Sequence, residues 1–500
     1  MRAPAACFVL SLGLMLFLVS PTLPAAPRQI VVADTADLTS GDPRIAGFQT
    51  DYDTIFQMCD ALVTFDRNSR VVPSLASSWR VINPTTYEFT LRSGAKFQDG
   101  TPVTAADVKQ TMDRILDPAF KSTTIAPDFE PLIKSTDVIT PTVVRFNLKI
   151  PYPAFLNRMV YIFPVSHTAV ERLGDKEFSR HPICAGPFRL AEWMPDDHKA
   201  LDAVANYWGG RPSVDRIIIK PVPQGATRVA GLRAGEVDLA VGVPPDQLEA
   251  VTRSPGLTVI TNPSGRRMLF FMDALSKPFD DRRVRQAVNY AIDWTAICKT
   301  IMGGLAQPLP GIAAPGVFGY TPVQGYEYNP AKAKQLLAEA GYSTGFDLAV
   351  EGPNGHYFQD RDTVQVVTGY LRAVGINATL QIYEWGQYAA RRRNRQFKMG
   401  LWASLPLYRD MDDLGFNLEA KRASTMYDNP AVARLFEAGR AEYDPQKRKA
   451  IYAKLTDLLE LDAPIVFGPE ITQAYGVTRR LKWRPRPGTD ILFGLRDAGL

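Results

Sequence analysis

The stretch from Pro73 to Pro118, PSLASSWRVINPTTYEFTLRSGAKFQDGTPVTAADVKQTMDRILDP, contains signals for both kinds of regular structure. Apolar and polar residues alternate over 87–91, which is typical of a half-buried strand. Asp99-Gly100 predicts a tight turn. Thr104-Ala105-Ala106-Asp107 resembles a capping box, and apolar residues recur at helical spacing over 108–116. The segment therefore predicts a strand, a turn and a capped helix in that order.

The same succession of strands and helices extends along the rest of the chain. Asn329-Pro330 and Asp444-Pro445 each place a capping side chain before a proline at the first helical position. Residues 217–219 and 268–272 are continuous apolar runs, as expected for strands that are covered on both faces. Residues 378–383 predict a strand directly after a helix. The pattern indicates an α/β architecture with mixed sheets.

Composition indicates a soluble chain with several domains. The 500 residues are 46% hydrophobic and 22% charged, and a chain of this length is expected to form about two or three domains. The net charge of +5 is too weak to indicate a nucleic-acid partner. Basic runs over 391–395 and 479–486 predict a solvated helix face and an exposed hairpin. We therefore expect no nucleic-acid partner.

The N-terminus has the pattern of a secretory signal peptide. Arg2 precedes an apolar run, Ala5–Val19, and small residues follow at Ala25 and Ala26. We expect residues 1–26 to form the signal segment, with cleavage near Ala25, and the protein to be periplasmic; an uncleaved membrane anchor is the alternative. Cys7 lies near the start of the apolar run and is removed with the signal peptide, so the protein is not expected to be a lipoprotein. The mature chain then keeps three cysteines, which allow at most one disulfide: Cys59, Cys184 and Cys298.

Motifs for catalysis are missing from the sequence. The four histidines do not form the helical pair of a zinc protease, and no serine lies in a nucleophile-elbow pattern. No phosphate-binding glycine loop and no close cysteine pair is present. We therefore expect no enzyme activity, no metal site and no cofactor. A secreted peptide hydrolase and a chaperone-like envelope protein remain the alternatives.

The segment Pro73–Pro118 resembles the signature region of the extracellular solute-binding proteins, family 5, which are the peptide- and nickel-type receptors of ABC importers. Cys184–Phe188 is similar to the Gly-Thr-Gly-Pro-Tyr turn of the family, with Cys184 in place of the first glycine. The blocks Lys277–Ala287 and Tyr328–Gly341 are also typical of it. The resemblance extends over the whole mature chain.

This resemblance implies a periplasmic-binding-protein-like fold of class II, with two α/β lobes around a hinged cleft and an extra inserted domain. Lobe one is expected to take residues 27–58, 184–262 and 470–500, the inserted domain 59–183, and lobe two 263–469. The implied function is capture of a small solute by lobe closure. A monomer would then deliver it to a membrane permease with its ATPase subunits. We expect a peptide; an opine, a glutathione-like tripeptide, a sugar derivative or a metal chelate are the alternatives.

The resemblance also suggests ligand-binding residues in lobe two. Asn354 and His356 lie in a turn-rich loop before a predicted helix, and Trp385 lies in a segment similar to one in dipeptide receptors. Trp385 is expected to line the cleft or to belong to the core. Trp402 precedes the segment in which peptide receptors place an Asp that holds the ligand's ammonium.

The register of that Asp is ambiguous in this chain. Alignment without a gap places Leu407 at the position. With one inserted residue, the family's Arg-x-Asp-Pro-Asp variant aligns with the acidic cluster formed by Asp410, Asp412 and Asp413. Asp412 is then the preferred anchor for the ligand's ammonium. Exposure of the whole cluster to solvent is the alternative. The predicted ligand-binding residues in this segment are Arg409, Asp410, Asp412 and Asp413.

Overall fold

The computed structural model describes residues 28–120, 125–405, 407–415, 418–419, 425–489, 491–492 and 494–500. The predicted signal peptide, 1–26, lies outside the described residues. Within these ranges, no helix combines the length and apolar character that a membrane span requires. The same ranges contain no group of three metal-ligating side chains.

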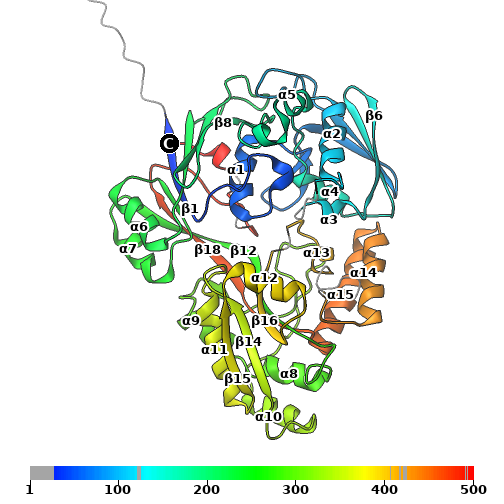
Figure 1. Ribbon diagram of the computed structural model, residues 1–500, viewed down its shortest axis with the longest axis vertical. Coiled ribbons are helices and arrows are strands. Elements are labelled where there is room, and N and C mark those ends of the chain that lie inside the picture. Colours follow the sequence, from blue (N-terminus) through cyan, green and yellow to red (C-terminus); the bar gives the residue numbers. More distant parts are fainter. Residues whose placement is uncertain are drawn as a thin grey trace, which may run out of the picture.

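One large mixed sheet runs through both lobes (Figure 1). Its strand order is β15-β14-β16-β12-β18-β11-β1-β10-β9-β8, with β13 on β18 and β17 on β12. The long strands β12 (Leu257–Met272) and β18 (Glu470–Thr478) pair antiparallel and pass between the lobes. The other strands are β1 (Gln29–Asp34), β8 (Phe188–Met194), β9 (His198–Ala203), β10 (Arg216–Pro221), β11 (Leu239–Val241), β13 (Ala306–Gln307), β14 (Asp347–Pro353), β15 (Asn377–Tyr383), β16 (Met399–Ser404) and β17 (Ile465–Val466).

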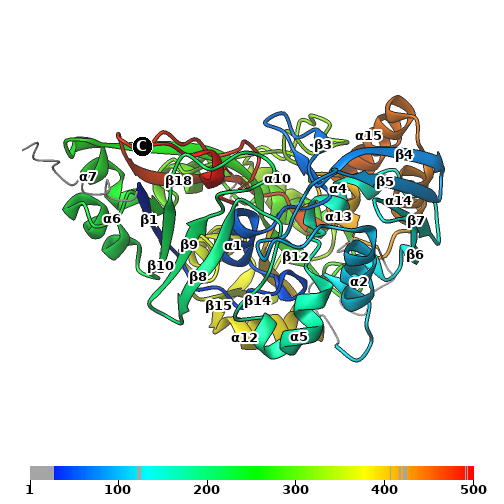
Figure 2. The same ribbon diagram turned by 90° about the horizontal axis from the view of Figure 1, so that it is seen from above.

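A separate four-stranded antiparallel sheet lies within the segment 59–183 that is predicted to be inserted. Figure 2 places it at the opposite end of the molecule from β1 and β10. Thr104 caps helix α2, and its amide donates to Asp107 Oδ2 at 2.8 Å, so the predicted capping box is confirmed. The elements are β2 (Val63–Phe65), β3 (Val71–Pro73), β4 (Ala76–Asn83), β5 (Thr86–Leu91), β6 (Ile133–Thr140), β7 (Val143–Leu148), α2 (Ala105–Ile115), α3 (Ala126–Phe129), α4 (Phe155–Arg158) and α5 (His167–Phe178).

The remaining helices belong to the two lobes, and several of them pack against the large sheet. Asn329 and Asp444 cap α10 and α15 as predicted, because their side chains accept amides of the first turn. In lobe one these helices are α1 (Gln49–Met58), α6 (Gly225–Ala234) and α7 (Leu248–Arg253). In lobe two they are α8 (Arg282–Tyr290), α9 (Trp294–Thr300), α10 (Pro330–Glu339), α11 (Asp360–Ala373), α12 (Trp385–Arg393), α13 (Asp412–Gly415), α14 (Pro430–Ala441) and α15 (Pro445–Asp462).

Two features hold the segments of the chain together. A disulfide joins Cys59, after the end of α1, to Cys184, before the start of β8, while Cys298 is free and buried. Arg267 on β12 is also buried and donates to the carbonyl oxygens of Ala313 at 3.1 Å and Gly468 at 2.6 Å. The pairing uses the one disulfide that three cysteines allow. The exact boundaries of the lobes and of the inserted domain stay predictions.

The basic run 391–395 is solvated only in part: Arg393 and Arg395 are exposed as expected, while Arg391 and Arg392 are half-buried. Arg391 forms a bidentate pair with Glu351, and Arg392 stacks on Trp402 with 3.5 Å between guanidinium carbon and ring centroid. Arg395 pairs with Asp273 at 3.0 Å. These arginines therefore serve packing within lobe two, since long side chains cover apolar surface while their charges find partners.

Candidate functional site

A pocket of about 260 Å³ lies where three parts of the chain meet. Lobe one contributes the start of α1, the inserted domain contributes α3, and lobe two contributes the segment after β16. In Figure 1, α1 lies above the paired strands β12 and β18, and β16 and α12 lie below them. The described lining residues are Ala46, Gly47, Phe48, Gln49, Tyr52, Ile125, Asp128, Arg266, Leu405, Leu407, Tyr408 and Ile491.

The first turn of α1 forms the lobe-one wall. Asp51 fixes this turn because its carboxylate accepts the amides of Gly47 at 3.0 Å and Phe48 at 3.1 Å. The Phe48 side chain is 50% exposed, which is unusual for a large apolar residue, and it lies at the pocket. The ring of Tyr52 packs edge-on against Tyr161. The wall therefore combines exposed apolar surface with a rigid backbone turn.

Arg266 enters the pocket from the strand that links the lobes. The register of β12 against β18 shifts between Pro263 and Arg267, which indicates a bulge. Gly265 has φ +73°, and a Cβ at this position would lie 2.9 Å from the carbonyl oxygen of Gly488. Only glycine fits there without strain. The bulge separates the half-buried Arg266, which lines the pocket, from Arg267, which is buried in lobe two.

Tyr408 and Asp128 close the opposite side. The Tyr408 hydroxyl donates to Asp128 Oδ2 at 2.7 Å, and Asn157 of the inserted domain donates to the Tyr408 carbonyl at 2.8 Å. Arg158 lies over the Tyr408 ring, with its guanidinium carbon 4.3 Å from the centroid. Burial raises the pKa of Tyr408 well above its usual range, so the phenol stays a neutral donor.

The structure brings three of the predicted binding residues together in an aromatic cluster. The His356 ring stacks on Trp385 at 3.4 Å and 8°, and Trp385 lies 6.3 Å from Trp402. Tyr357, which the sequence analysis missed, packs edge-on against both tryptophans. Burial by its neighbours and the charge of Arg266 lower the pKa of His356 to about 4, so the imidazole is neutral at pH 7. None of these four aromatic residues is among the described residues that line the pocket.

The predicted anchor Asp412 has partners from within the protein. Its Oδ2 accepts the Tyr152 hydroxyl of the inserted domain at 2.7 Å, and its Oδ1 accepts Arg440 of α14 at 2.5 Å. Asp410 is 2% exposed and forms a bidentate pair with Arg448 of α15 at 2.6 and 2.7 Å. The structure thus gives these two carboxylates structural partners, and the predicted contact of Asp412 with a ligand ammonium stays a prediction.

The other predicted residues differ in their surroundings. Asp413 Oδ2 accepts the Tyr408 amide at 2.8 Å; burial raises the pKa of Asp413 well above its usual range, and the charge of Arg158 opposes this rise. Arg409 donates to Ser69 and to the Pro487 carbonyl, away from lobe two. Asn354 is exposed in the turn before α11. The segment 407–413 is therefore a junction between domains as well as a pocket wall.

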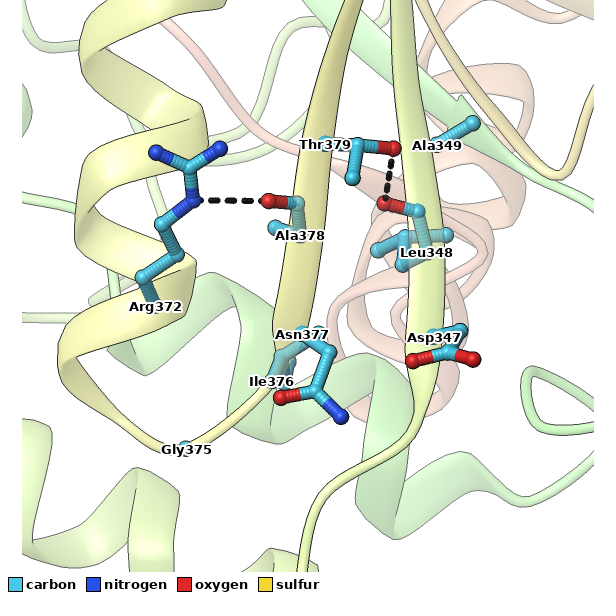
Figure 3. A pocket seen from close by; sticks show the side chains of 9 residues that line it. All are labelled: Asp347, Leu348, Ala349, Arg372, Gly375, Ile376, Asn377, Ala378 and Thr379. Carbon is cyan, nitrogen blue, oxygen red and sulfur yellow. Dashed lines mark hydrogen bonds between the residues drawn. The ribbon is translucent and has the colours of Figure 1, made fainter.

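A larger hollow lies at the far end of lobe two (Figure 3). It encloses about 670 Å³ beside β14 and β15, and Arg372 reaches over it to donate to the Ala378 carbonyl at 2.7 Å. Its walls come from one lobe alone. Closure of the two lobes would not exclude water from this hollow, so ligand binding there would not depend on lobe closure.

Sequence reasoning missed most of the pocket. Asp128, Arg266 and Tyr408 carry no motif, and they meet only because three segments of the chain converge. Leu407 is the exception, since alignment without a gap marked that position, and the residue does line the pocket. A second signal was available in Arg266 and Arg267, two adjacent charges directly before the apolar run 268–272.

Comparison with known proteins identifies relatives along nearly the whole chain. The model of the bacterial extracellular solute-binding proteins, family 5, matches residues 70–425. The glutathione-binding protein GsiB of Salmonella typhi is 30% identical over 463 residues, which is 88% of each chain. The periplasmic binding protein DppA of Helicobacter pylori, solved with the peptide STSA, is 25% identical with a TM-score of 0.83 over 94% of this chain and 98% of that one. AgaA of A. tumefaciens R10, solved with agropinic acid, is 26% identical with a TM-score of 0.81 over 94% and 97%.

Proposed function

The chain belongs to the bacterial extracellular solute-binding proteins of family 5, and we propose that its solute is a small anionic peptide-like compound of the glutathione class. The fold is that of the class II periplasmic binding proteins, as predicted. Members of the family are substrate-binding proteins of ABC importers, so the chain binds a solute for delivery to a permease and is not an enzyme.

The observation that carries the proposal is the charge of the pocket. Arg266 stands on the linking strand and Asp128 on the inserted domain, and both line the same small space. A guanidinium binds a carboxylate through two parallel hydrogen bonds, and closure of the lobes strengthens such a pair by excluding water. In the alignment without a gap, Leu407 provides no charge where peptide receptors have an Asp. We therefore propose that carboxylate recognition by Arg266 dominates binding.

The size of the pocket favours a compact solute. Pockets for drug-sized ligands usually measure roughly 300–1,000 Å³, and this one measures about 260 Å³. A dipeptide or tripeptide suits such a volume better than an extended oligopeptide. The relative GsiB, at 30% identity, is described as a glutathione-binding protein, which supports the same class.

The aromatic cluster is proposed as the second wall of the site. His356, Trp385 and Trp402 keep the role that the sequence analysis gave them, and Tyr357 and Arg392 join them. Stacked rings offer flat apolar surface to the body of a peptide-like ligand.

A thermal-shift screen of the protein from residue 26 onward tests the proposal. The solutes are reduced glutathione, glutathione disulfide, di- and tripeptides, the peptide STSA and agropinic acid. Glutathione at 100 times its Kd should stabilise the fold by about 2.7 kcal/mol without being consumed. A larger shift with agropinic acid would assign the opine class instead, and larger shifts with oligopeptides would contradict the compact anionic solute.

The remaining features of the importer are also proposed. We infer that the protein acts as a monomer and that the permease works with ATPase subunits. We also infer a periplasmic location, with cleavage near Ala25. N-terminal sequencing of exported protein should give a chain that begins at or near Ala26, and an intact Met1 would contradict this processing.

A further inference from the structure

We propose that Asp128 of the inserted domain, oriented by Tyr408, is the carboxylate that binds the ammonium of the solute. This inference rests on the proposed function, since it names the group that selects an amine-bearing member of that solute class. It moves the anchor from the acidic cluster of lobe two to a different domain.

The pocket itself points to Asp128. Among its described lining residues, Asp128 is the one carboxylate and Arg266 the one guanidinium. The side chain of Asp128 is 26% exposed, so it is reachable from the pocket and still partly shielded from water. Leu407 precedes Tyr408 in the same wall and offers only apolar surface.

Asp410 and Asp412 of the acidic cluster are buried and already bind protein donors. Both oxygens of Asp410 accept Arg448, and the oxygens of Asp412 accept Arg440 and Tyr152. Because both side chains are buried, a ligand ammonium could reach them only by displacing the protein groups that cover them, whereas the side chain of Asp128 is 26% exposed.

The hydrogen bonds of Asp128 leave one oxygen available. Oδ2 accepts the Tyr408 hydroxyl at 2.7 Å, while Oδ1 lies 3.7 Å from Nη1 of Arg158, beyond hydrogen-bond distance. A carboxylate oxygen can accept two hydrogen bonds, so Oδ1 can receive an ammonium. Tyr408 fixes the carboxylate rotamer from the other side.

Arg158 is shared between Asp128, whose Oδ1 lies 3.7 Å from its Nη1, and two acidic residues of lobe two. Its Nη2 lies 3.9 Å from Asp412 and 4.0 Å from Asp413, and its Nε donates to Tyr152 at 2.9 Å. These two residues therefore share the guanidinium with Asp128. The Oδ1 of Asp128 has no hydrogen bond at this distance and can accept a ligand ammonium.

Titration calorimetry with two probes tests the inference. The probes are glutathione and N-acetylglutathione, which keeps both carboxylates and lacks the ammonium. A hydrogen bond to a charged group predicts that Asp128→Asn binds glutathione about 10- to 100-fold more weakly, while its affinity for N-acetylglutathione stays within about twofold. Wild-type protein should prefer glutathione over the acetylated probe by a similar factor. Tyr408→Phe should weaken glutathione binding by a smaller factor.

The control is Asp113→Asn, at an exposed position of α2 in the same domain, which should bind both probes as wild type does. If Asp128→Asn binds glutathione as tightly as wild type, the inference is overturned and the proposed function stands. If wild-type protein bound neither probe, both the inference and the proposed function would be overturned. If Asp128→Asn does not fold, the wild-type preference between the two probes decides, and equal affinities would overturn the inference.

Discussion

The hydroxyl of Tyr408 and the carboxylate of Asp128 meet at 2.7 Å, although 280 positions separate the two residues in the chain. Tyr408 follows the last long strand of lobe two, and Asp128 lies in the short helix α3 of the inserted domain. Tyr161 packs edge-on against the Tyr408 ring at 5.5 Å. The pocket wall is thus made by a contact between domains, so occupancy of the pocket and the relative position of these domains are coupled.

Replacement of Arg266 should weaken binding of carboxylate-bearing solutes. Arg266→Gln removes a bidentate donor from a partly shielded site, so glutathione should bind about 10- to 100-fold more weakly. Titration calorimetry measures this. Arg372→Gln, in the hollow at the far end of lobe two, is the matched control and should bind as wild type does. If Arg372→Gln weakened binding and Arg266→Gln did not, the binding site would lie in that hollow.

Replacement of Asp410 should affect stability and spare affinity. Asp410→Asn breaks a buried pair and leaves Arg448 uncompensated, which predicts a loss of about 3–5 kcal/mol in the free energy of unfolding. Urea denaturation gives this loss, and binding of glutathione at 15 °C should stay within about twofold.

Asp412→Asn provides the comparison, because it also loses buried partners, Arg440 and Tyr152. We expect it to lose stability by a similar mechanism. A variant with wild-type stability and a more than hundredfold loss of affinity would instead establish Asp412 as the ligand anchor.

The disulfide should contribute substantially to stability. Cys59 and Cys184 are 125 positions apart, and closing a loop of this length removes chain entropy from the unfolded state. The double variant Cys59→Ala/Cys184→Ala should lose about 2–5 kcal/mol in the free energy of unfolding.

Burial raises the pKa of the Cys298 thiol to about 12, so native protein from residue 26 onward should show no reactive thiol and denatured protein one. Three thiols without reductant would contradict the pairing.

Glu460 should make stability fall as pH rises. Burial raises the pKa of this carboxyl from 4.5 to about 7, against the opposing charge of Arg267, and both of its oxygens are buried without a partner among the described residues. Because the folded-state pKa exceeds the unfolded value, the native state binds more protons than the unfolded state between pH 4.5 and 7. The free energy of unfolding therefore falls as the pH rises across that window.

Glu460→Gln should therefore be more stable than wild type at pH 8, by up to about 3 kcal/mol, and similar to it at pH 4.5. Chemical denaturation at the two pH values measures the difference. Glu249→Gln, at an exposed position of α7, should show no such pH dependence. An equal effect of Glu460→Gln at both pH values would show that the carboxyl does not titrate in this range.

Local elements of the fold could be predicted because their causes are local. The cap of α2 at Thr104 and the starts of α10 and α15 at Asn329 and Asp444 depend on side chains within one turn of the helix they cap. The family blocks, such as Pro73–Pro118, likewise reflect short-range constraints on strands and turns. The fold class followed from them.

The acidic cluster demonstrates the limit of such reasoning. The sequence displays Asp410, Asp412 and Asp413 as three neighbouring acids, which suggested a cationic ligand. Their partners Arg440 and Arg448 lie on α14 and α15, and no local pattern connects these helices to the cluster. A charge can be assigned to a ligand only after its protein partners are known.

The sequence by itself determined that this chain is a solute-binding protein of family 5, with an α/β fold and capped helices at predictable positions. Tertiary structure alone decided which charges face the pocket. Arg266 reaches it through a bulge in a linking strand, and Asp128 reaches it because the inserted domain packs against Tyr408. The physical reason is that a binding site requires a few side chains converging from distant segments, whereas a strand or a helix cap requires only neighbours along the chain.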